Sequence, residues 1–339
     1  MLAEYRDRSG RGAGKRRNTR SRKRRKQQRR RVLVSALSEI IILVLLAGAF
    51  CWNRGLKAKV SSVVGIFDGP PVKELDVSGV NSSNVVLMDV KSGKVIGEMN
   101  GEERIYPASM TKIMTALVAL EAFSDLDREI TLSQDIFYAL DGQDATQAGF
   151  QPGEEVRIRD LVYGVILPSG AECCLALADE VAGSEEAFVE KMNQKAKAIG
   201  MKNTNFVDCT GLHDPEHYST AYDIALLLKY ALHNDTFCDV IESHFHSTPG
   251  TNVHPDGITY YSTMFKNMSD TSVVGGEILG GKTGYTSEAG HCLASFAQIY
   301  DREYILVTAG AAADATGIPH IQDAKTLYNR LGEAVAEKQ

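Results

Sequence analysis

Cysteine is scarce in this sequence, and its positions match no metal-binding pattern. The chain has six cysteines, none of them in a C-x-x-C pair or a zinc-finger spacing, so we expect no structural metal. Cys51 lies in an apolar run, which leaves five others, an odd number. A full disulfide framework is therefore not expected. A single bridge between Cys174 and Cys209 stays open, because spacing alone does not fix the distance between two sulfurs.

Acidic residues are nearly missing from the first 31 positions. Residues 1–31 hold 15 of the 37 Lys and Arg residues but only two acids. Their local charge is +13, so the remaining chain carries −19 to give the net charge of −6. This split predicts that the two parts meet different surroundings. Taken alone, the basic run fits nucleic-acid binding. The segment that follows it favours a different interpretation, a basic flank beside a membrane helix.

A run of 21 residues, almost all apolar, follows the basic segment. Residues 32–52 are interrupted only by two serines and one glutamate. As a helix this run measures about 31 Å, close to the hydrocarbon thickness of a bilayer. Basic residues flank one end, and Trp52 marks the other interface. The positive-inside rule predicts a cytoplasmic tail over 1–31, a single-pass membrane anchor over 32–52 and an extracellular remainder, with no nucleic-acid partner.

A cleaved signal peptide is the alternative for this run. Residues 47–49 (AGA) resemble an A-x-A cleavage site. The basic region is unusually long for a signal peptide, and the apolar run is long enough to span a bilayer, so we favour the retained anchor. Both interpretations put residues 55–339 outside the cell.

A linker is predicted over residues 53–82, followed by one globular domain over 83–339. Apolar runs at 85–88 and 94–96 flank a Lys-Ser-Gly turn. Two such runs around a glycine turn predict a β-hairpin near the start of the domain.

The rest of the domain alternates between helical and strand-like patterns. Helical periodicity runs through Met110–Phe123, twice through 160–200 and through Ile321–Ala336, whereas 279–310 is strand-like. The sequence contains no internal repeat. This order of elements predicts a mixed, α+β domain built on an antiparallel sheet.

The first candidate site is the segment 107–112 (PASMTK). If Ser109 begins a helix, Lys112 lies one turn on, on the same face. A serine hydroxyl is a weak nucleophile until a base takes its proton, and a lysine with a lowered pKa can be that base. The N–H groups of a helix start can also bind an oxyanion. Alone, however, S-x-x-K is better explained as a capping serine followed by a surface lysine.

Two further clusters strengthen this candidate. Residues 167–171 (LPSGA) place Ser169 on a loop before a helix predicted over Glu172–Ala182. Residues 280–286 (GGKTGYT) place Lys282 beside a hydroxyl on a strand. S-x-x-K followed by S-D-N and K-T-G is a signature of class A β-lactamases and penicillin-binding proteins. Here the elements follow in that order.

With these motifs, the chain from about Asn84 to its end resembles the low-molecular-weight D-alanyl-D-alanine carboxypeptidases of bacteria, which are penicillin-binding proteins. The stretches 211–214 (GLHD) and 217–221 (HYSTA) carry the same resemblance. It implies the serine β-lactamase type of fold, an antiparallel sheet flanked by helices with a helical lobe. It also implies peptidoglycan stem peptides ending in D-Ala-D-Ala as substrate, β-lactam antibiotics as covalent ligands, and no cofactor.

The resemblance also implies catalytic roles. Ser109 would be the acylated nucleophile, and Lys112 would be its base. Ser169 would pass a proton toward the leaving D-alanine.

A second group of residues would bind the substrate. Lys282 and Thr283 would hold its terminal carboxylate, and Gly284 and Tyr285 continue the same strand. The N–H groups of Ser109 and Tyr285 would form the oxyanion hole.

The second motif departs from the family pattern. Its third position is usually Asn, whose amide supports the base and contacts the substrate, but here it is Ala171. A missing amide can raise the barrier by several kcal/mol unless another group replaces it. We expect the adjacent Glu172 to compensate.

Other enzyme classes compete with this interpretation. A serine β-lactamase of the same fold needs a Glu that activates water. The nearest candidate, Glu190, fits a solvated helix face better. A weakly active penicillin-binding protein is a further alternative, which Ala171 alone favours.

Two remoter alternatives come from short patterns. Residues 276–283 match the P-loop pattern G-x-x-x-x-G-K-[ST], but the sequence after them is poor helix material. His244, His246 and His254 are spaced as metal ligands can be, but no acidic cluster accompanies them, so surface histidines explain them better.

Overall fold

The computed structural model describes residues 72–337. The predicted basic tail (1–31), the predicted membrane anchor (32–52) and most of the predicted linker lie outside the described residues. Between residues 72 and 337 no helix combines the length and the apolar character needed to span a bilayer.

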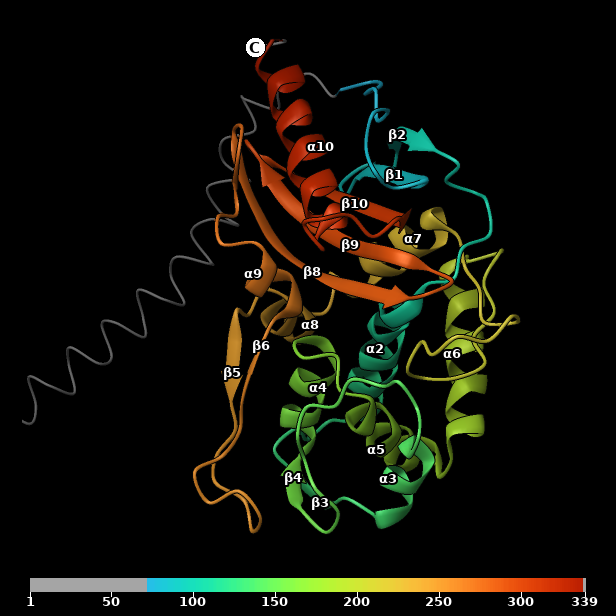
Figure 1. Ribbon diagram of the computed structural model, residues 1–339, viewed down its shortest axis with the longest axis vertical. Coiled ribbons are helices and arrows are strands. Elements are labelled where there is room, and N and C mark those ends of the chain that lie inside the picture. The colour runs from blue at the N-terminus through green and yellow to red at the C-terminus, as the bar shows by residue number, and fades with distance from the viewer. Residues whose placement is uncertain (1–71, 338–339) are drawn as a thin grey trace, which may run out of the picture. The chain divides into compact units, whose positions relative to one another are not determined.

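An antiparallel sheet of six strands in the order β2-β1-β10-β9-β8-β7 organises the described part of the chain (Figure 1). The strands are β1 (Asn84–Asp89), β2 (Val95–Met99), β7 (Ser272–Val273), β8 (Gly276–Thr286), β9 (Gly290–Ile299) and β10 (Arg302–Ala311). The predicted hairpin is β1 and β2, and β1 pairs along its whole length with β10. Strands from the two ends of the described sequence therefore share one sheet.

Both faces of the sheet are covered, as the alternation of β1 shows. Val85 and Leu87 belong to a core cluster that includes the apolar face of α10 (Pro319–Ala336). Val86 and Met88 belong to a second, larger cluster on the opposite face. Successive side chains of a strand point to opposite faces, so a strand between two cores is apolar throughout.

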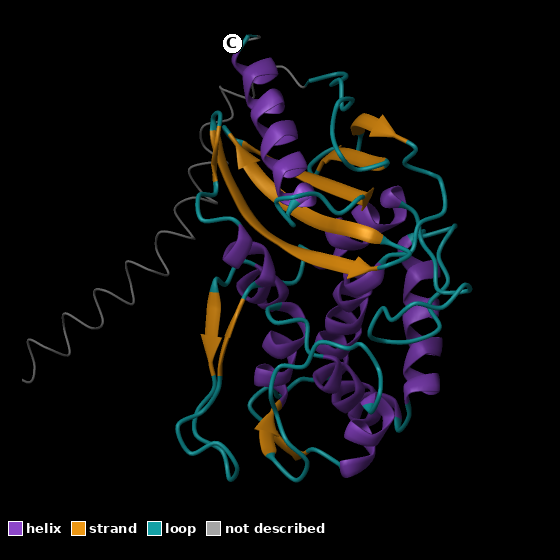
Figure 2. Cartoon of the chain, viewed as in Figure 1, coloured by secondary structure: helices purple, strands orange, loops and turns teal. Residues whose placement is uncertain are grey.

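The opposite face is covered by a lobe of helices (Figure 2). Its elements are η1 (Ala108–Thr111), α2 (Lys112–Ala122), α3 (Gln134–Leu140), α4 (Ile158–Ile166), α5 (Ala171–Ala182), α6 (Glu185–Ile199), α7 (Ala221–Ala231) and α8 (Asp235–Ile241). Two short hairpins complete the lobe, β3 (Glu129–Thr131) with β4 (Glu155–Arg157), and β5 (Phe245–Ser247) with β6 (Thr259–Tyr261). Helix α9 (Thr263–Asn267) instead buries Met264 and Phe265 in the cluster that contains α10. Helix α2 lies within the lobe and buries its first nine residues. A helix that is apolar on all sides fits such a central position.

Several sequence predictions need correction. Three helices rather than two lie between 158 and 199, because Gly183 ends α5 with a φ of 79° and Ser184 caps α6 by accepting from Ala187 N. Residues 276–286 form one continuous strand. This confirms the strand predicted around Lys282 and excludes the remote P-loop alternative, since a P-loop needs a helix directly after its lysine.

The packed part of the chain begins before the predicted domain boundary at residue 83. Val72, Leu75 and Val77 are buried in the core cluster that contains α10. Leu75 N also donates to Ile96 O of β2. Residues 72–82 are therefore part of the folded domain.

Four of the five cysteines between residues 72 and 337 are buried free thiols: Cys173, Cys174, Cys209 and Cys292. Burial raises the pKa of Cys174 to about 12. A bridge between Cys174 and Cys209 is not formed, and these residues act as small apolar side chains.

Candidate active site

The three motifs found in the sequence meet where η1 and α5 approach β8. Lys112 Nζ donates to Ser109 Oγ at 3.2 Å and to Thr210 O at 2.5 Å. Lys282 Nζ donates to Ser169 Oγ at 3.0 Å and to Thr283 O at 2.9 Å. Each lysine thus holds one serine hydroxyl and one backbone carbonyl. Thr210 has no place in the three motifs, and its contribution comes from the backbone.

Two residues of the site, one of them a serine, have unusual backbone conformations. Ser169 has a φ of 72°, and Ala108, directly before Ser109, has a φ of 46°. Non-glycine residues rarely adopt positive φ values, and such residues concentrate at functional sites because the surrounding contacts must hold them there. The strain lies at two of the three motifs.

The third motif requires its glycine. A methyl group at Gly284 would lie 3.1 Å from Pro107 O, from Ser109 N and from the Ala108 side chain. Strand β8 therefore runs directly against the turn that carries Ser109. This close approach explains why Gly follows Lys-Thr in the motif.

Lys282 is fully buried next to a second cation. Burial lowers the pKa of Lys282 well below its usual range, and the charge of Lys112 lowers it further. A buried lysine with a lowered pKa exchanges protons more readily near neutral pH than an exposed one.

The substrate-facing end of β8 is formed by hydroxyls and a ring. Thr283 Oγ1 lies 2.7 Å from Thr263 Oγ1 at the start of α9. Tyr285, two residues further along β8, is 57% exposed. Thr263 carries no motif signal, because its contact with Thr283 arises only when α9 packs against β8.

Glu172 does not take the place of the missing amide at Ala171. Its Oε1 accepts from Ala148 N at 2.6 Å and from Gly149 N at 2.9 Å. The Lys112 ammonium instead donates to Ser109 and to the Thr210 carbonyl. Burial raises the pKa of Glu172, and the backbone N–H groups oppose that rise. Glu172 therefore fastens the 148–149 segment to the start of α5, and the expected compensation is corrected.

The histidines considered as metal ligands pair with separate carboxylates. His246 Nε2 lies 2.7 Å from Asp160 Oδ1, and His254 Nδ1 lies 2.9 Å from Glu154 Oε1. Across residues 72–337 no three side chains of metal-binding type come together. The carboxylates of Asp160 and Glu154 are buried. His246 and His254 are therefore held in structural contacts and are not the free surface histidines that the sequence predicted.

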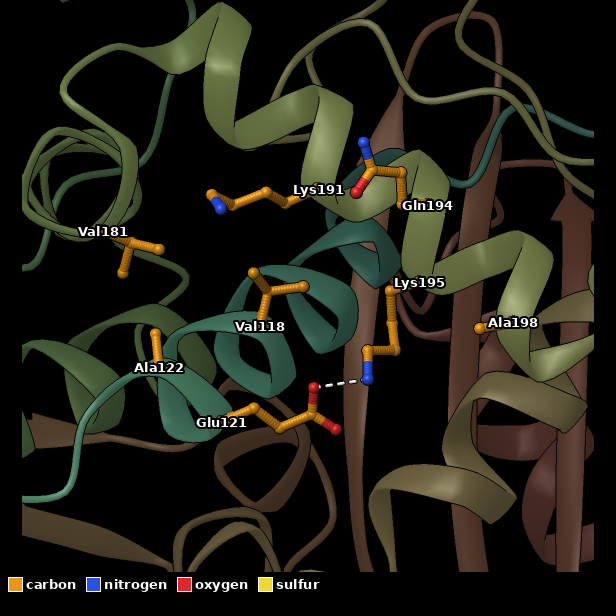
Figure 3. A pocket seen from close by; sticks show the side chains of 8 residues that line it. All are labelled: Val118, Glu121, Ala122, Val181, Lys191, Gln194, Lys195 and Ala198. Carbon is orange, nitrogen blue, oxygen red and sulfur yellow. Dashed lines mark ion pairs between the residues drawn. The ribbon is translucent and has the colours of Figure 1, made fainter.

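A hollow between α2 and α6 lies apart from the motif residues (Figure 3). Its lining includes Val118, Val181 and the ion pair of Glu121 with Lys195 at 2.5 Å. Glu121 is nine residues beyond Lys112 on α2, a rise of about 13 Å. Glu190 of α6 is exposed to solvent. This side of the lobe therefore contributes nothing to the Ser109 region.

Comparison with solved structures defines the class of fold. The Streptomyces K15 DD-transpeptidase superposes with a TM-score of 0.67 at 25% identity, over 76% of this chain and 98% of that one. The mixed α/β architecture, with its antiparallel sheet and helical lobe, is thus that of the penicillin-binding proteins.

The sequence comparison specifies the family. The D-alanyl-D-alanine carboxypeptidase family model matches residues 72–313, and the chain belongs to this family. The carboxypeptidase DacF of Bacillus subtilis is 35% identical over 251 residues, which cover 72% of this chain and 60% of DacF. DacC of Escherichia coli is 34% identical and is covered to 59%. The chain thus spans about 60% of the length of these curated relatives.

The burial of Lys282 is expected to lower the free energy of unfolding at neutral pH. Its folded pKa lies below its unfolded value, so the unfolded chain binds more protons between these values and wild-type stability should rise from neutral pH toward pH 10. Lys282→Met should raise the free energy of unfolding at pH 7 by about 1 kcal/mol and flatten this rise. Denaturant unfolding at several pH values measures both effects.

A matched control is Lys197→Met on exposed α6, which should change stability by less than about 0.5 kcal/mol. A less stable Lys282→Met protein with an unchanged pH slope would contradict the prediction.

The contacts of Glu172 predict that its Oε1 atom, as a hydrogen-bond acceptor, stabilises the fold. Glu172→Ala leaves two backbone N–H groups without an acceptor and should lower the free energy of unfolding by about 1–3 kcal/mol. Glu172→Gln keeps an amide oxygen for both bonds and should unfold close to the wild type. Glu190→Ala, at an exposed position of α6, is the control. Equal losses for Glu172→Ala and Glu172→Gln would show that the charge, not the oxygen acceptor, is what counts.

Proposed function

We propose that this protein is a serine D-alanyl-D-alanine carboxypeptidase that removes the terminal D-alanine of peptidoglycan stem peptides through an acyl-enzyme on Ser109. The 3.2 Å contact of Lys112 Nζ with Ser109 Oγ, in a chain of this family, is the observation that carries the proposal. It pairs a nucleophile with a base inside hydrogen-bonding reach.

In acylation, Ser109 Oγ attacks the carbonyl carbon of the penultimate D-alanine while its proton passes to Lys112. The oxyanion that forms is held by the N–H groups of Ser109 and Tyr285, which stabilise charge that develops in the transition state. The C–N bond then breaks, and the amine of the leaving D-alanine receives a proton through Ser169. The contact of Ser169 Oγ with Lys282 Nζ at 3.0 Å supports this route.

Recognition rests on the second half of β8. The charge of Lys282 and the hydroxyl of Thr283 bind the terminal carboxylate of the substrate, and Thr263 orients that hydroxyl at 2.7 Å. Gly284 lets the strand approach the Ser109 turn. Lys112 is neutral again once the proton it took from Ser109 has passed through Ser169 to the departing D-alanine. Water then attacks the ester and gives its proton to Lys112, which returns it to Ser109 Oγ as the ester C–O bond breaks and the shortened peptide leaves.

β-Lactams mimic the acyl-D-Ala-D-Ala end, so they acylate the same serine. A serine β-lactamase and a weakly active penicillin-binding protein remain alternative outcomes. The carboxylate nearest to Ser169 in sequence, Glu172, is engaged with backbone N–H groups, and Glu190 is solvent-exposed. Neither arrangement favours a deacylating glutamate, so slow turnover of penicillin is expected.

A second fate of the acyl-enzyme is transfer to an amine instead of water. The likeness to a DD-transpeptidase structure favours testing it. The two fates share the same acylation step and differ only in the acceptor.

We further propose that residues 32–52 anchor the chain as a single-pass helix, with 1–31 in the cytoplasm and the catalytic domain outside the cell. Full-length protein should be extracted from membranes by detergent and not by high salt, because salt screens surface charges but leaves a buried apolar helix in place. A mature N-terminus near Phe50 would instead show that the segment is a cleaved signal peptide.

The decisive assay is release of free D-alanine from a peptide ending in D-Ala-D-Ala by the full-length protein. Ser109→Ala should abolish release and penicillin labelling, and Lys112→Ala should slow both at least about 100-fold, because the serine then keeps its proton. Lys197→Met should behave as wild type. Rapid penicillin hydrolysis with an untouched peptide would identify a β-lactamase, and a penicilloyl group mapped to another residue would refute the assignment of Ser109.

A further inference from the structure

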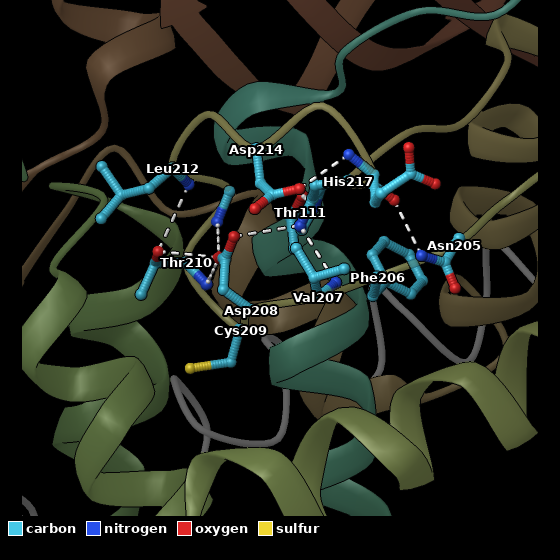
Figure 4. Close-up of polar contacts among 12 residues, drawn as sticks. Thr111, Asn205, Phe206, Val207, Asp208, Cys209, Thr210, Leu212, Asp214 and His217 are labelled. Carbon is cyan, nitrogen blue, oxygen red and sulfur yellow. Dashed lines mark hydrogen bonds and ion pairs between the residues drawn. The ribbon is translucent and has the colours of Figure 1, made fainter.

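A buried Asp-His pair lies directly beside the Ser109 turn and has no part in the steps above. His217 Nδ1 lies 3.0 Å from Asp208 Oδ2, and His217 Nε2 lies 2.8 Å from Thr111 Oγ1 (Figure 4). His217 is 2% exposed, and Thr111 is fully buried. The three side chains form a line that ends inside the S-x-x-K segment itself.

The line has one consistent assignment of donors. Val207 N also approaches His217 Nδ1, at 3.3 Å, but a carboxylate has no proton to give, so the shorter contact makes Nδ1–H the donor to Asp208. Nε2 then faces the Thr111 hydroxyl. Burial raises the pKa of Asp208, but the hydrogen bond and charge of His217, with Gly211 N and the Thr210 hydroxyl, lower it to about 2. Asp208 is thus ionised at neutral pH.

The order Asp-His-hydroxyl is that of a catalytic triad, but the hydroxyl cannot reach a substrate. Thr111 is fully buried, whereas Ser109, two residues earlier, is half-buried. The line therefore acts on neighbouring residues rather than on the substrate.

Both ends of the line lead to Lys112. At one end, Thr111 directly precedes Lys112 in the chain. At the other, Asp208 Oδ1 accepts from Thr210 N at 2.7 Å, Thr210 Oγ1 at 2.8 Å and Gly211 N at 2.6 Å. These three bonds fix the turn whose Thr210 carbonyl accepts from Lys112 Nζ.

The turn is pressed against the Ser109 segment. Gly211 has a φ of 83°, and a methyl group there would lie 1.9 Å from Ala108 O. No other residue type fits this approach without moving the backbone. A shift of the Asp208 turn would therefore move Ala108 and Lys112 together.

Fixing the Thr210 carbonyl has a chemical consequence. A neutral lysine amine has two N–H groups and one lone pair. In the structure Lys112 Nζ donates to both the Thr210 carbonyl and Ser109 Oγ. When the amine is neutral, one N–H stays on the Thr210 carbonyl, and the lone pair can take the place of the second donor toward Ser109 Oγ. This orientation is what a general base needs before it takes the serine proton.

We propose that Asp208 and His217 are positioning residues, which hold Thr111 and the Thr210 carbonyl and thereby orient Lys112 toward Ser109. This inference rests on the proposed acylation of Ser109.

Other titratable groups also face Lys112, and the test must leave them unchanged. Lys282 approaches from β8, and Cys173 and Cys174 approach from α5. None of them is altered in the variants below.

The test measures the acylation rate constant of full-length protein with a fluorescent penicillin across pH, together with kcat and KM for D-alanine release. His217→Leu should slow acylation on the order of 10- to 100-fold, because misplacing a reacting group by about 1 Å has effects of that size. It should lower kcat more than it changes KM. The rising limb of the pH profile should also move, because Lys112 Nζ then has no fixed acceptor at the Thr210 carbonyl.

His217→Gln is the conservative variant. Its amide can donate to Asp208 and accept from Thr111 at once, so it should recover most of the rate and the wild-type limb. His246→Gln is the matched control, because it alters another histidine paired with a buried aspartate, Asp160 at 2.7 Å. It should leave both rate and limb unchanged.

Each outcome decides the question. A folded His217→Leu protein that acylates within twofold of wild type, with an unmoved limb, overturns the positioning role. If His217→Leu does not fold, Asp208→Asn decides in its place. The Asn oxygen can still accept from the Thr210 turn, but its N–H group cannot accept from His217 Nδ1, so only the His217–Thr111 end of the line is released. An acylation rate within twofold of wild type in Asp208→Asn overturns the role of that end and with it the inference. Failure of the wild type itself to be labelled would reject the proposed function, a result that the variants cannot imitate.

Discussion

Two lysine ammonium groups buried in one protein interior impose the main constraint on this structure. Lys112 and Lys282 are both nearly inaccessible to solvent, and an unpaired buried charge is strongly unfavourable. Each is satisfied in the same way, by one serine hydroxyl and one threonine carbonyl. Neither is paired with a carboxylate through these contacts. Oxygen dipoles rather than carboxylates therefore surround both Nζ atoms, and burial lowers the pKa of Lys282.

The surrounding backbone follows from this constraint. Carbonyls and hydroxyls must converge on two points, and helices and strands in regular geometry direct these groups elsewhere. The chain leaves regular geometry at Ala108 and Ser169, both with positive φ, and at Gly211. Glu172 and Asp208 each accept from backbone N–H groups next to those places. The buried carboxylates of Glu172 and Asp208 thus fix the neighbouring loops by accepting from their N–H groups. Those loops in turn supply oxygen atoms that accept from Lys112 and Lys282.

How far the sequence predicted this arrangement depends on the kind of atom involved. Ser109 and Lys112 lie one turn apart, so local geometry alone predicts their contact. The meeting of Ser169 with Lys282 followed only from the resemblance to a known family. The Thr210 carbonyl could not be predicted, because every residue carries the same backbone oxygen and only the folded turn selects one. The expectation for Glu172 failed for a related reason: neighbours in sequence on a helix face different directions.

The pairing of β1 with β10 also governs when the site can exist during synthesis. Asn84 of β1 is opposite Ala309 of β10, so β1 can pair only after more than two hundred further residues have been synthesised. The strands that supply Lys282 and close the sheet follow helices α2 to α9 in the sequence. Contacts so distant along the chain form slowly, and earlier segments remain exposed to wrong partners meanwhile. A growing chain therefore has most helices of the lobe early, but the two lysines come together only after β8, β9 and β10 have been made.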